Sequence, residues 1–270
     1  MERPAWAPQG IDISVPSVSR IYDYYLGGSH NFEVDREAAR KAMEFMPGLP
    51  KIMQANRAFM RRAVRFAAHQ GITQFLDIGS GIPTFGNVHE VAQAASPGAK
   101  VAYVDHDPVA VAHSEAVLAG NDRAVIAAAD LRKPQEILDN AEVTGLLDLN
   151  RPVALLLVAV LHFIEDADDP RAAVATLRDA LAPGSVMILT HASFEGIPLT
   201  EERAGGTVGV YKNIKNPLVM RPREEVSRFF DGYEMVEPGL VSMPNWRPEA
   251  PVAQEDPFAF SGFAGVGRKA

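Results

Sequence analysis

The sequence contains no cysteine among its 270 residues. Disulfide bonds, thiolate zinc sites, iron–sulfur clusters and cysteine nucleophiles are therefore excluded. The seven histidines show no spacing typical of metal ligands, and no acidic cluster accompanies them, so we expect no metal site.

An excess of positive charge is also missing. The net charge is -8 and the isoelectric point is near 5.4. Binding to nucleic acids or to anionic membranes requires a basic surface, so we expect neither partner. The densest basic segment, residues 57–65, has helical spacing and is predicted to form a solvated helix face.

Long apolar runs are absent as well. The longest, VALLLVAVLHFI at residues 153–164, is too short for a bilayer, which takes about 20 residues to cross. The opening MERPAWAPQGID lacks the basic-then-apolar profile of a signal peptide. These features predict a cytoplasmic protein.

What is present after residue 73 is a series of short apolar runs separated by helical or turn segments. They read QFLDIG, KVAYVD, RAVIAAAD, PVALLLVAV and SVMILTHAS. Runs that are apolar on both faces are typical of parallel strands covered by helices, which predicts an α/β fold with a doubly wound sheet. YEMVEPGLVSM and FSGFAGVGRK have no crossover helix between them, so we expect seven strands ending in an antiparallel hairpin.

The first part of the chain has helical patterns and no strand-like alternation. Helices are predicted around SVPSVSRIYDYYL, VDREAARKAMEFM and KIMQANRAFMRRAVRFAAHQG, with Gly-Gly at 27–28 and PGLP at 47–50 as breaks. We therefore expect an N-terminal helical cap over residues 1–70 and a Rossmann-like domain over residues 71–270.

The first predicted strand leads into the glycine turn DIGSG, residues 77–81. Ligands of open α/β sheets bind at the carboxyl ends of strands, and glycines let a ligand approach the backbone closely. Asp77, Gly79, Ser80 and Gly81 are therefore candidate ligand-binding residues. A G-x-G turn alone is weak evidence for a ligand, because many strand-to-helix turns contain these glycines for steric reasons only.

The turn departs from the dinucleotide fingerprint. That fingerprint needs a small residue where Thr84 stands, and Pro83 precedes it. Pro83 is also predicted to remove a backbone N–H from the start of the next helix. Both points count against a nicotinamide cofactor.

Acids also end the second and third predicted strands. Asp105, in VAYVDHDP, stands where a carboxylate would accept both ribose hydroxyls of an adenosine, and His106 is expected beside the adenosine. Asp130 and Leu131, in AAADLRKP, reach the same edge, where an acid could bind the adenine amine. Each acid alone could be a turn residue. With Asp77, however, acids stand at three consecutive strand ends, which indicates an adenosine-containing ligand.

Taken together, LDIGSGIPT, YVDHDP, AADLRKP and VAVLHFIED resemble motifs of the seven-stranded, Rossmann-like S-adenosylmethionine-dependent methyltransferases. IDISVPSVSRIYDYYLGGSHNFEVDREAA and FAGVGRKA are similar to a bacterial S-adenosyl methyltransferase family, formerly a domain of unknown function. This resemblance covers nearly the whole chain. It implies S-adenosylmethionine as cofactor and S-adenosylhomocysteine as product. Pro83 stands where the general motif has a third glycine.

Methyl transfer depends more on positioning the acceptor than on a strong base. His162, just past the fourth predicted strand, could be a general base or could instead bind the backbone beside the cofactor. His191 and Glu195 are weaker candidates.

The segment YDYYLGGSHNF, residues 22–32, is the other source of candidates. Its aromatic residues could simply pack on the sheet, but a polar Ser-His-Asn after the Gly-Gly stop is not required for packing. We expect Tyr25, His30 and Asn31 to close the pocket or contact the methionine end of the cofactor. Tyr25 and His30 thereby join His162 as catalytic candidates. Arg20 is predicted to pair with the cofactor carboxylate.

The favoured function is a methyltransferase that acts on a small-molecule acceptor. A nicotinamide-dependent oxidoreductase and a non-catalytic sensor of S-adenosylmethionine or S-adenosylhomocysteine are the alternatives. A nucleic-acid methyltransferase is disfavoured by the acidic balance and by the lack of an Asn/Asp-Pro-Pro-aromatic element. The sequence assigns neither the acceptor nor an oligomeric state.

Overall fold

The computed structural model describes residues 7, 11–84, 86–212, 214, 217–252 and 260–270. A seven-stranded sheet in the order β3-β2-β1-β4-β5-β7-β6 forms its centre. The strands are β1 (Gln74–Ile78), β2 (Lys100–Asp105), β3 (Ala124–Ala128), β4 (Ala154–Val158), β5 (Val186–His191), β6 (Tyr233–Met235) and β7 (Phe263–Lys269). Strands β1 to β5 are parallel, and β7 pairs antiparallel with β5 and β6. The predicted sheet, including its antiparallel end, is confirmed.

Helices precede the sheet and connect its strands. Those before the sheet are α1 (Val18–Tyr25), α2 (Glu33–Phe45) and α3 (Leu49–His69). Those within it are α4 (Val88–Ala95), α5 (Pro108–Leu118), α6 (Pro134–Leu138), α7 (Ala141–Leu146), α8 (Pro170–Ala180), α9 (Glu201–Tyr211) and α10 (Arg223–Ser227). Short 3-10 turns follow β4 at Leu161–Phe163 and Asp166–Asp168, follow α10 at Arg228–Phe230, and follow β6 at Met243–Asn245. Across the described ranges, no helix combines the length and apolarity that crossing a membrane requires.

Strand β4 shows why the apolar runs carry no polar alternation. Leu156 packs into the core shared with α3 and α4, whereas Leu155 and Leu157 pack into the core shared with α6, α7 and α8. All three leucines are fully buried. Because successive side chains of a strand point to opposite faces, a sheet covered on both sides needs apolar residues at every position.

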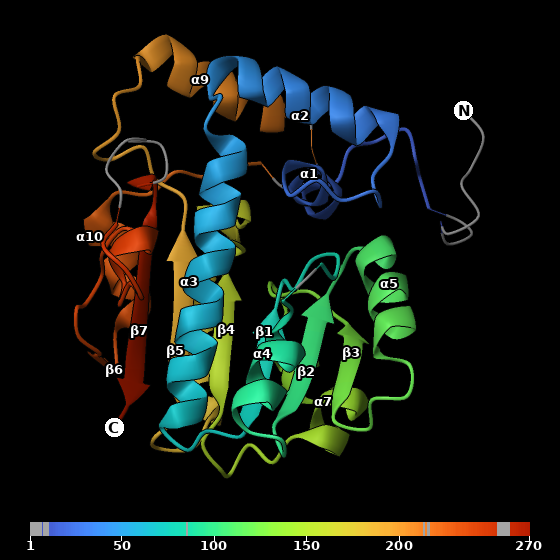
Figure 1. Cartoon of the computed structure of the whole chain (residues 1–270), viewed down its shortest axis with the longest axis vertical. Helices are drawn as coiled ribbons and strands as arrows, with labels where there is room; N and C mark the ends of the chain where they lie inside the picture. The colour runs from blue at the N-terminus through green and yellow to red at the C-terminus, as the bar shows by residue number, and fades with distance from the viewer. Residues whose placement is uncertain (1–6, 8–10, 85, 213, 215–216, 253–259) are drawn as a thin grey trace.

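The carboxyl ends of the parallel strands lie beneath a layer formed by α1, α2 and α9 (Figure 1). Helix α9 follows β5 in the chain, yet it packs against α2. Their approach is close, because a Cβ added at Gly206 of α9 would lie 2.3 Å from the Phe45 ring. Helix α3 instead runs along one face of the sheet, against α4, β4 and β5. The layer over the sheet edge therefore differs from the helical cap predicted over residues 1–70. It includes α9, whereas α3 packs on a face of the sheet.

Strand β1 is the topological switch point, because it pairs with β2 on one side and with β4 on the other. The chain moves outward from β1 to β3 and then returns to the other side of β1 with β4. A crevice forms at such a point, outside the carboxyl ends of the strands, and it is the usual ligand site of open α/β sheets.

Candidate active site

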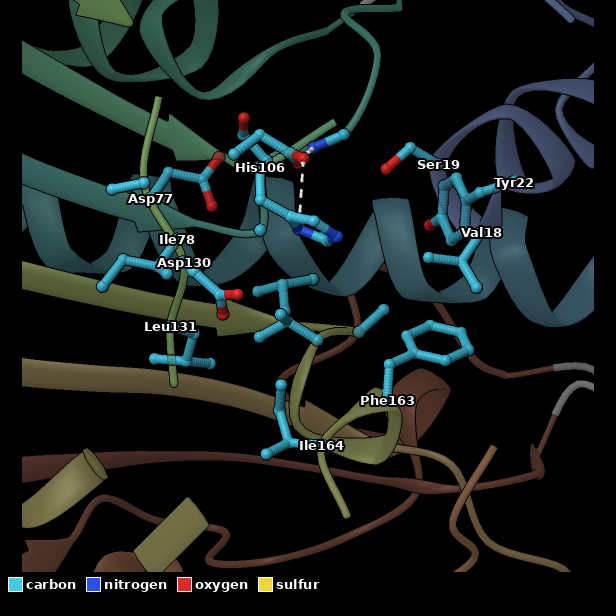
Figure 2. Close-up of a pocket in the computed structure, with 18 of the residues that line it drawn as sticks. Val18, Ser19, Tyr22, Asp77, Ile78, His106, Asp130, Leu131, Phe163 and Ile164 are labelled. Atoms are coloured by element: carbon cyan, nitrogen blue, oxygen red, sulfur yellow. Dashed lines mark hydrogen bonds and ion pairs between the residues drawn. The ribbon is translucent and has the colours of Figure 1, made fainter. Parts of the chain in front are cut away.

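A cavity of about 910 Å³ lies at the switch point, between the strand ends and α1 (Figure 2). Figure 2 shows Asp77 and Asp130 on the strand side and Ser19 and Tyr22 of α1 opposite them. The lining includes most of the cofactor-binding residues predicted from the sequence: Asp77, Gly79, Ser80, Gly81, Asp105, His106, Asp130 and Leu131. Residues contributed by three successive strand ends therefore face one volume. We refer to it as the strand-end cavity.

The glycine turn forms the floor of this cavity. Gly79 and Gly81 have φ of 73° and 68°, in the left-handed region that favours glycine. A Cβ on Gly79 would also lie 2.4 Å from the Val160 side chain. The backbone N–H groups of Gly79 and Ser80 donate to the Val104 carbonyl of β2, at 2.8 and 3.2 Å. Both glycines are thus required by the backbone path and not only by a ligand.

The loop after the turn differs from the prediction for Pro83. Helix α4 begins at Val88, with Asn87 as its N-cap residue, so Pro83 lies in the loop and not in the first turn of a helix. Its missing N–H removes nothing from the helix terminus. The Asn87 side chain instead accepts the N–H of Thr84, at 2.9 Å, and this bond orders the loop.

Asp105 connects the glycine turn to the end of β2. One carboxylate oxygen accepts the N–H of Gly81 at 2.7 Å and the other accepts the N–H of Asp107 at 2.8 Å. Burial raises the pKa of Asp105, and these two hydrogen bonds oppose that shift. A carboxylate has about four lone-pair sites, so two remain for hydroxyl groups of a ligand.

Asp130 lies at the end of β3 and forms an ion pair with Arg132, with an N–O distance of 2.5 Å. Partial burial acts to raise the pKa of Asp130, but the hydrogen bonds from Arg132 outweigh it and lower the pKa. Asp130 is therefore ionised at neutral pH and can accept a hydrogen bond from an amine. Arg132 also lines the cavity and holds this carboxylate in place.

Two buried donors in the strand-end cavity have no partner among the described residues: Nε of Arg57 and the hydroxyl of Ser80. A terminal nitrogen of Arg57 is bound to Thr84 Oγ1 at 3.0 Å, which fixes the guanidinium beside Asp77. Unpaired buried donors are rare in folded proteins and indicate a place for a polar ligand. A carboxylate fits Arg57 and Ser80, and an ammonium group fits Asp77. These residues match the amino-acid end of the implied cofactor.

Arg57 is a residue that the sequence analysis missed. Its segment was predicted to be a solvated face, but Arg57 is half-buried in the cavity wall. Its neighbour Arg62 donates to the carbonyls of Met243 and Trp246, at 2.7 and 2.9 Å. The dense basic run was the sequence feature that could have indicated these roles. Arg62 binds a loop, and Arg57 lines the cavity.

The buried Asp77 gives a pH-dependent prediction. Burial, opposed by Arg57 and reinforced by Asp105, raises the pKa of Asp77 from 3.8 to about 7. Between these values the folded chain holds a proton that the unfolded chain releases, so this contribution to stability is present below pH 3.8 and is lost as the pH rises through 7. Between pH 5 and pH 8, ligand-free wild type should lose up to about 3 kcal/mol that Asp77→Asn does not lose.

Urea unfolding of both proteins at pH 5 and pH 8 measures this difference, and other titrating groups cancel in the comparison. Asp122→Asn, at an exposed position, is the matched control and should follow wild type. Equal loss of stability in wild type and in Asp77→Asn would show that Asp77 is ionised in the folded chain throughout this range.

Arg20 lies away from the strand-end cavity, so the structure does not support its predicted role. Its Nε binds Asp35 at 2.9 Å, and a terminal nitrogen donates to the carbonyl of Val15 at 2.6 Å. Arg20 and Asp35 are both buried. The guanidinium therefore compensates a buried carboxylate of α2, and Arg57 is the cation that faces the cavity.

His30 and Asn31 also lie outside the lining of the strand-end cavity. One oxygen of Asp23 accepts both the backbone N–H of His30 and the side-chain amide of Asn31, at 2.9 and 2.8 Å. The turn leaves no room for a side chain at Gly28, where a Cβ would lie 1.9 Å from Asp23. Contrary to the prediction, the polar residues after the Gly-Gly stop shape the connection between α1 and α2.

Tyr25 and His162 line a second cavity, which adjoins the first beneath the helical layer. Nδ1 of His162 accepts the N–H of Ala192 at 3.1 Å. Burial, together with His191 and Arg221, lowers the pKa of His162 well below the usual value for histidine. A neutral ring whose Nδ1 is an acceptor carries its proton on Nε2. His162 is therefore a hydrogen-bond donor in this state, which disagrees with its predicted use as a general base and agrees with the backbone-binding alternative.

The two weaker candidates, His191 and Glu195, also have hydrogen-bond partners within the protein. Nδ1 of His191 lies 2.8 Å from the carbonyl of Ala192, and Nε2 lies 3.0 Å from Arg221. Burial lowers the pKa of His191 to about 4, so the ring is neutral at pH 7. The carboxylate of Glu195 accepts the backbone N–H of Arg223, the first residue of α10, at 3.0 Å. In the part of the chain that the structure describes, no cluster of three or more potential metal ligands occurs.

Comparison with known proteins agrees with this geometry. The chain is similar to a candidate methyltransferase from Thermobifida fusca YX, with 40% identity, a TM-score of 0.91 and coverage of 98% of this chain and 99% of that one. A DUF574 family protein from Streptomyces avermitilis MA-4680 is 38% identical, with a TM-score of 0.91 and coverage of 96% and 99%. An O-methyltransferase family protein from Burkholderia thailandensis shares the fold at 10% identity, with a TM-score of 0.54 over 92% of this chain and 64% of that one.

The search of curated proteins gave no significant match. The model of the S-adenosyl methyltransferase family, in contrast, matches residues 4–270. Because this match spans nearly the whole chain, the chain belongs to the S-adenosyl methyltransferase family and is an S-adenosylmethionine-dependent methyltransferase.

Proposed function

We propose that this methyltransferase binds S-adenosylmethionine in the strand-end cavity and methylates a small molecule. The observation that carries the proposal is the pair of unpaired buried donors on Arg57 and Ser80, in the same cavity as the strand-end acids. Asp105 would hold the ribose hydroxyls, and Asp130 with Leu131 would hold the adenine. Arg57, Ser80 and Asp77 would hold the amino-acid end.

The bound cofactor supplies a methyl group on a positively charged sulfur, so transfer needs an aligned lone pair and little acid–base assistance. The protein's part is to bind, orient and exclude water. Tyr22 and Ser19 of α1 lie opposite the strand ends and cover the cavity (Figure 2). Asn56 fixes Tyr22 by donating to its hydroxyl at 2.8 Å.

A small-molecule acceptor is supported by the apolar second cavity beside the first and by the net charge of -8, which opposes binding to nucleic acids and to anionic membranes. A cytoplasmic location is part of the same proposal, as is a bacterial source, which the two similar bacterial proteins support.

The proposal is tested with Arg57→Met, which keeps the aliphatic stem and removes the guanidinium. A charge-assisted hydrogen bond contributes about 1.5–3 kcal/mol, so we expect about 10- to 100-fold weaker binding of S-adenosylhomocysteine by calorimetry. Arg65→Met is the control, because Arg65 lies on the same helix and pairs with Glu249 at the surface. Absence of binding by wild type, or equal binding by Arg57→Met, would overturn the assignment of this cavity.

A further inference from the structure

The second cavity, which we call the cap cavity, has a volume of about 690 Å³ and lies beside the strand-end cavity. Val18, Tyr22, Asn56, Ala159 and Phe163 line both, so they form a shared wall. The rest of the cap cavity comes mainly from α1, α3 and α9, from Met46 just after α2, and from residues at and after the ends of β4 and β5. A molecule in the cap cavity would thus lie next to a cofactor in the strand-end cavity.

The described residues that line the cap cavity carry no ionised side chain. None of its described lining residues is an aspartate, glutamate, lysine or arginine. The two histidines that line it are neutral at pH 7, because burial lowers the pKa of each. Burial also raises the pKa of Tyr211 to about 12, so its phenol stays protonated. A charged group entering this cavity would lose its hydration without gaining a partner of opposite charge.

Methionine and aromatic side chains form a large part of the apolar lining, beside aliphatic side chains. Met46, Met53, Met220 and Met243 contribute flexible, polarisable surface. Phe163 and Tyr211 contribute rings, whose centroids are 6.2 Å apart. This combination suits an apolar ring system, because thioethers and aromatic edges pack favourably on aromatic faces.

Most polar atoms of the cap cavity are already paired within the protein. Thr190 accepts the N–H of Ala159 at 2.8 Å and donates to Asn56 at 2.7 Å. Thr207 and Ser261 donate to backbone carbonyls, at 2.9 and 2.8 Å. These groups hold the wall together and are unavailable as primary contacts of a ligand.

Among the described residues that line only the cap cavity, two side-chain donors are available to a ligand. One is the Nε2–H of His162, since the hydrogen bond between this ring and the N–H of Ala192 uses Nδ1. The other comes from Tyr25 and Tyr211, whose hydroxyl oxygens are 3.1 Å apart. One hydroxyl of this pair donates to the other, which leaves a single O–H able to donate elsewhere. Both donors suit a neutral hydrogen-bond acceptor, such as a carbonyl oxygen or a ring nitrogen.

We propose that the cap cavity binds the methyl acceptor, and that this acceptor is an uncharged, largely apolar ring compound carrying a neutral hydrogen-bond acceptor. This inference rests on the proposed function, which places the cofactor in the adjoining cavity. Amino acids, nucleotides and phosphorylated sugars are excluded as acceptors by their charge.

The same lining limits the reacting group. A lone pair of the acceptor forms the bond to the methyl carbon while the carbon–sulfur bond breaks, its electron pair stays on sulfur, and any proton of the methylated group passes to water. Because no ionised base occurs among the described residues of the cap cavity, we expect the nucleophile to present its lone pair unaided. Uncharged amines and ring nitrogens meet this requirement.

A matched pair of fluorescent probes tests the predicted lack of charge. N-phenyl-1-naphthylamine is neutral, and 8-anilinonaphthalene-1-sulfonate is the same ring system with a sulfonate. We expect the neutral probe to bind one site per chain, with S-adenosylhomocysteine present, and the sulfonate to bind that site about 100-fold more weakly or worse. Equal affinity of the two probes, or no binding of the neutral one, would overturn the inference.

Leu218→Trp locates the probe, because Leu218 lines only the cap cavity and a larger side chain would fill it. This variant should lose the neutral probe and still bind S-adenosylhomocysteine. Leu146→Trp, at a half-buried leucine on α7 at the far end of the sheet, should retain both. Probe binding that persists in Leu218→Trp would place it elsewhere and contradict the proposal. Failure of S-adenosylhomocysteine to bind wild type would instead reject the proposed function, so the two failures are distinguishable.

The predicted hydrogen bond has its own test in the displacement of the neutral probe by 2-acetylnaphthalene and by 2-ethylnaphthalene. These competitors share a shape and differ in the carbonyl. The preference for the ketone, relative to wild type, should fall about 3- to 10-fold in Tyr25→Phe/Tyr211→Phe or in His162→Phe. An unchanged preference in both variants would show that neither donor contacts the ligand.

Discussion

Replacing Asp105 with asparagine is expected to weaken binding of S-adenosylhomocysteine by about 100-fold or more, because the change removes charge-assisted hydrogen bonds worth about 1.5–3 kcal/mol each. The carboxylate of Asp105 has two roles. It would accept the ribose hydroxyls, and it accepts the N–H groups of Gly81 and Asp107, at 2.7 and 2.8 Å. An amide offers only one acceptor oxygen, and its NH₂ group would face one of these N–H donors. The glycine turn would therefore shift together with the loss of the ligand contact.

Calorimetric titration with S-adenosylhomocysteine measures the effect, and a thermal melt of each protein confirms that it is folded. Asp122→Asn has the same chemical change at an exposed position and should bind like wild type. The neutral probe of the cap cavity should bind Asp105→Asn normally, because Asp105 lines only the strand-end cavity. Undiminished affinity for S-adenosylhomocysteine in Asp105→Asn would reject the assigned ribose contact.

Arg20→Met is expected to destabilise the fold by about 3–5 kcal/mol, because removing one partner of a buried ion pair leaves an uncompensated charge. Asp35 is fully buried, and its other partners are the N–H groups of Ser17 and Phe32, each within 2.9 Å. Burial raises the pKa of Asp35, and Arg20 is the cation that opposes this shift. The same ion pair joins α1 to α2, so its loss should also loosen the layer over the cavities.

Urea unfolding measures the change in the free energy of unfolding. The double variant Arg20→Met/Asp35→Asn should recover part of the loss, because a neutral amide needs no cation and still accepts a backbone N–H. Arg40→Met, which removes an exposed ion pair with Glu33, should leave stability nearly unchanged. If Arg20→Met kept wild-type stability and lost affinity for S-adenosylhomocysteine, the sequence-based assignment of Arg20 to the cofactor would be right after all.

The sheet was predictable because a strand buried on both faces has a distinctive composition. The run around Leu155 and Leu156 is apolar at every position, and that pattern fits neither an amphipathic helix nor a half-exposed strand. Once the strands were known, Asp105 and Asp130 followed from their positions at strand ends, because parallel strands end at one edge of the sheet.

The helical layer was less predictable, because its contacts join segments that are far apart in the chain. Nothing local to residues 201–211 indicates that α9 packs against α2, since the close approach at Gly206 depends on Phe45. Arg20 was predicted to face the cofactor and Arg57 to face solvent, and the structure differs from both predictions for the same reason. Both are arginines on helices, and which of them faces Asp35 or the strand-end cavity depends on how those helices pack.

His162 illustrates a different limit of sequence information. Its position after β4 was clear, but its chemistry depends on which ring nitrogen is an acceptor. The backbone N–H of Ala192, which follows β5, settles that question. Tautomers depend on neighbours in space, and the sequence around residue 162 contains no trace of this one.

The shared wall between the two cavities has an evolutionary consequence. Apart from that wall, the strand-end cavity is built largely from the ends of β1, β2 and β3. The cap cavity is built mainly from α1, α3 and α9, from Met46 just after α2, and from residues at and after the ends of β4 and β5. Substitutions on one side of the wall can therefore alter which molecule is methylated while leaving the methyl donor's site intact. Under the proposed assignment, a lineage with this architecture can diversify its substrates through changes in α1, α3, α9 and the segments after β4 and β5.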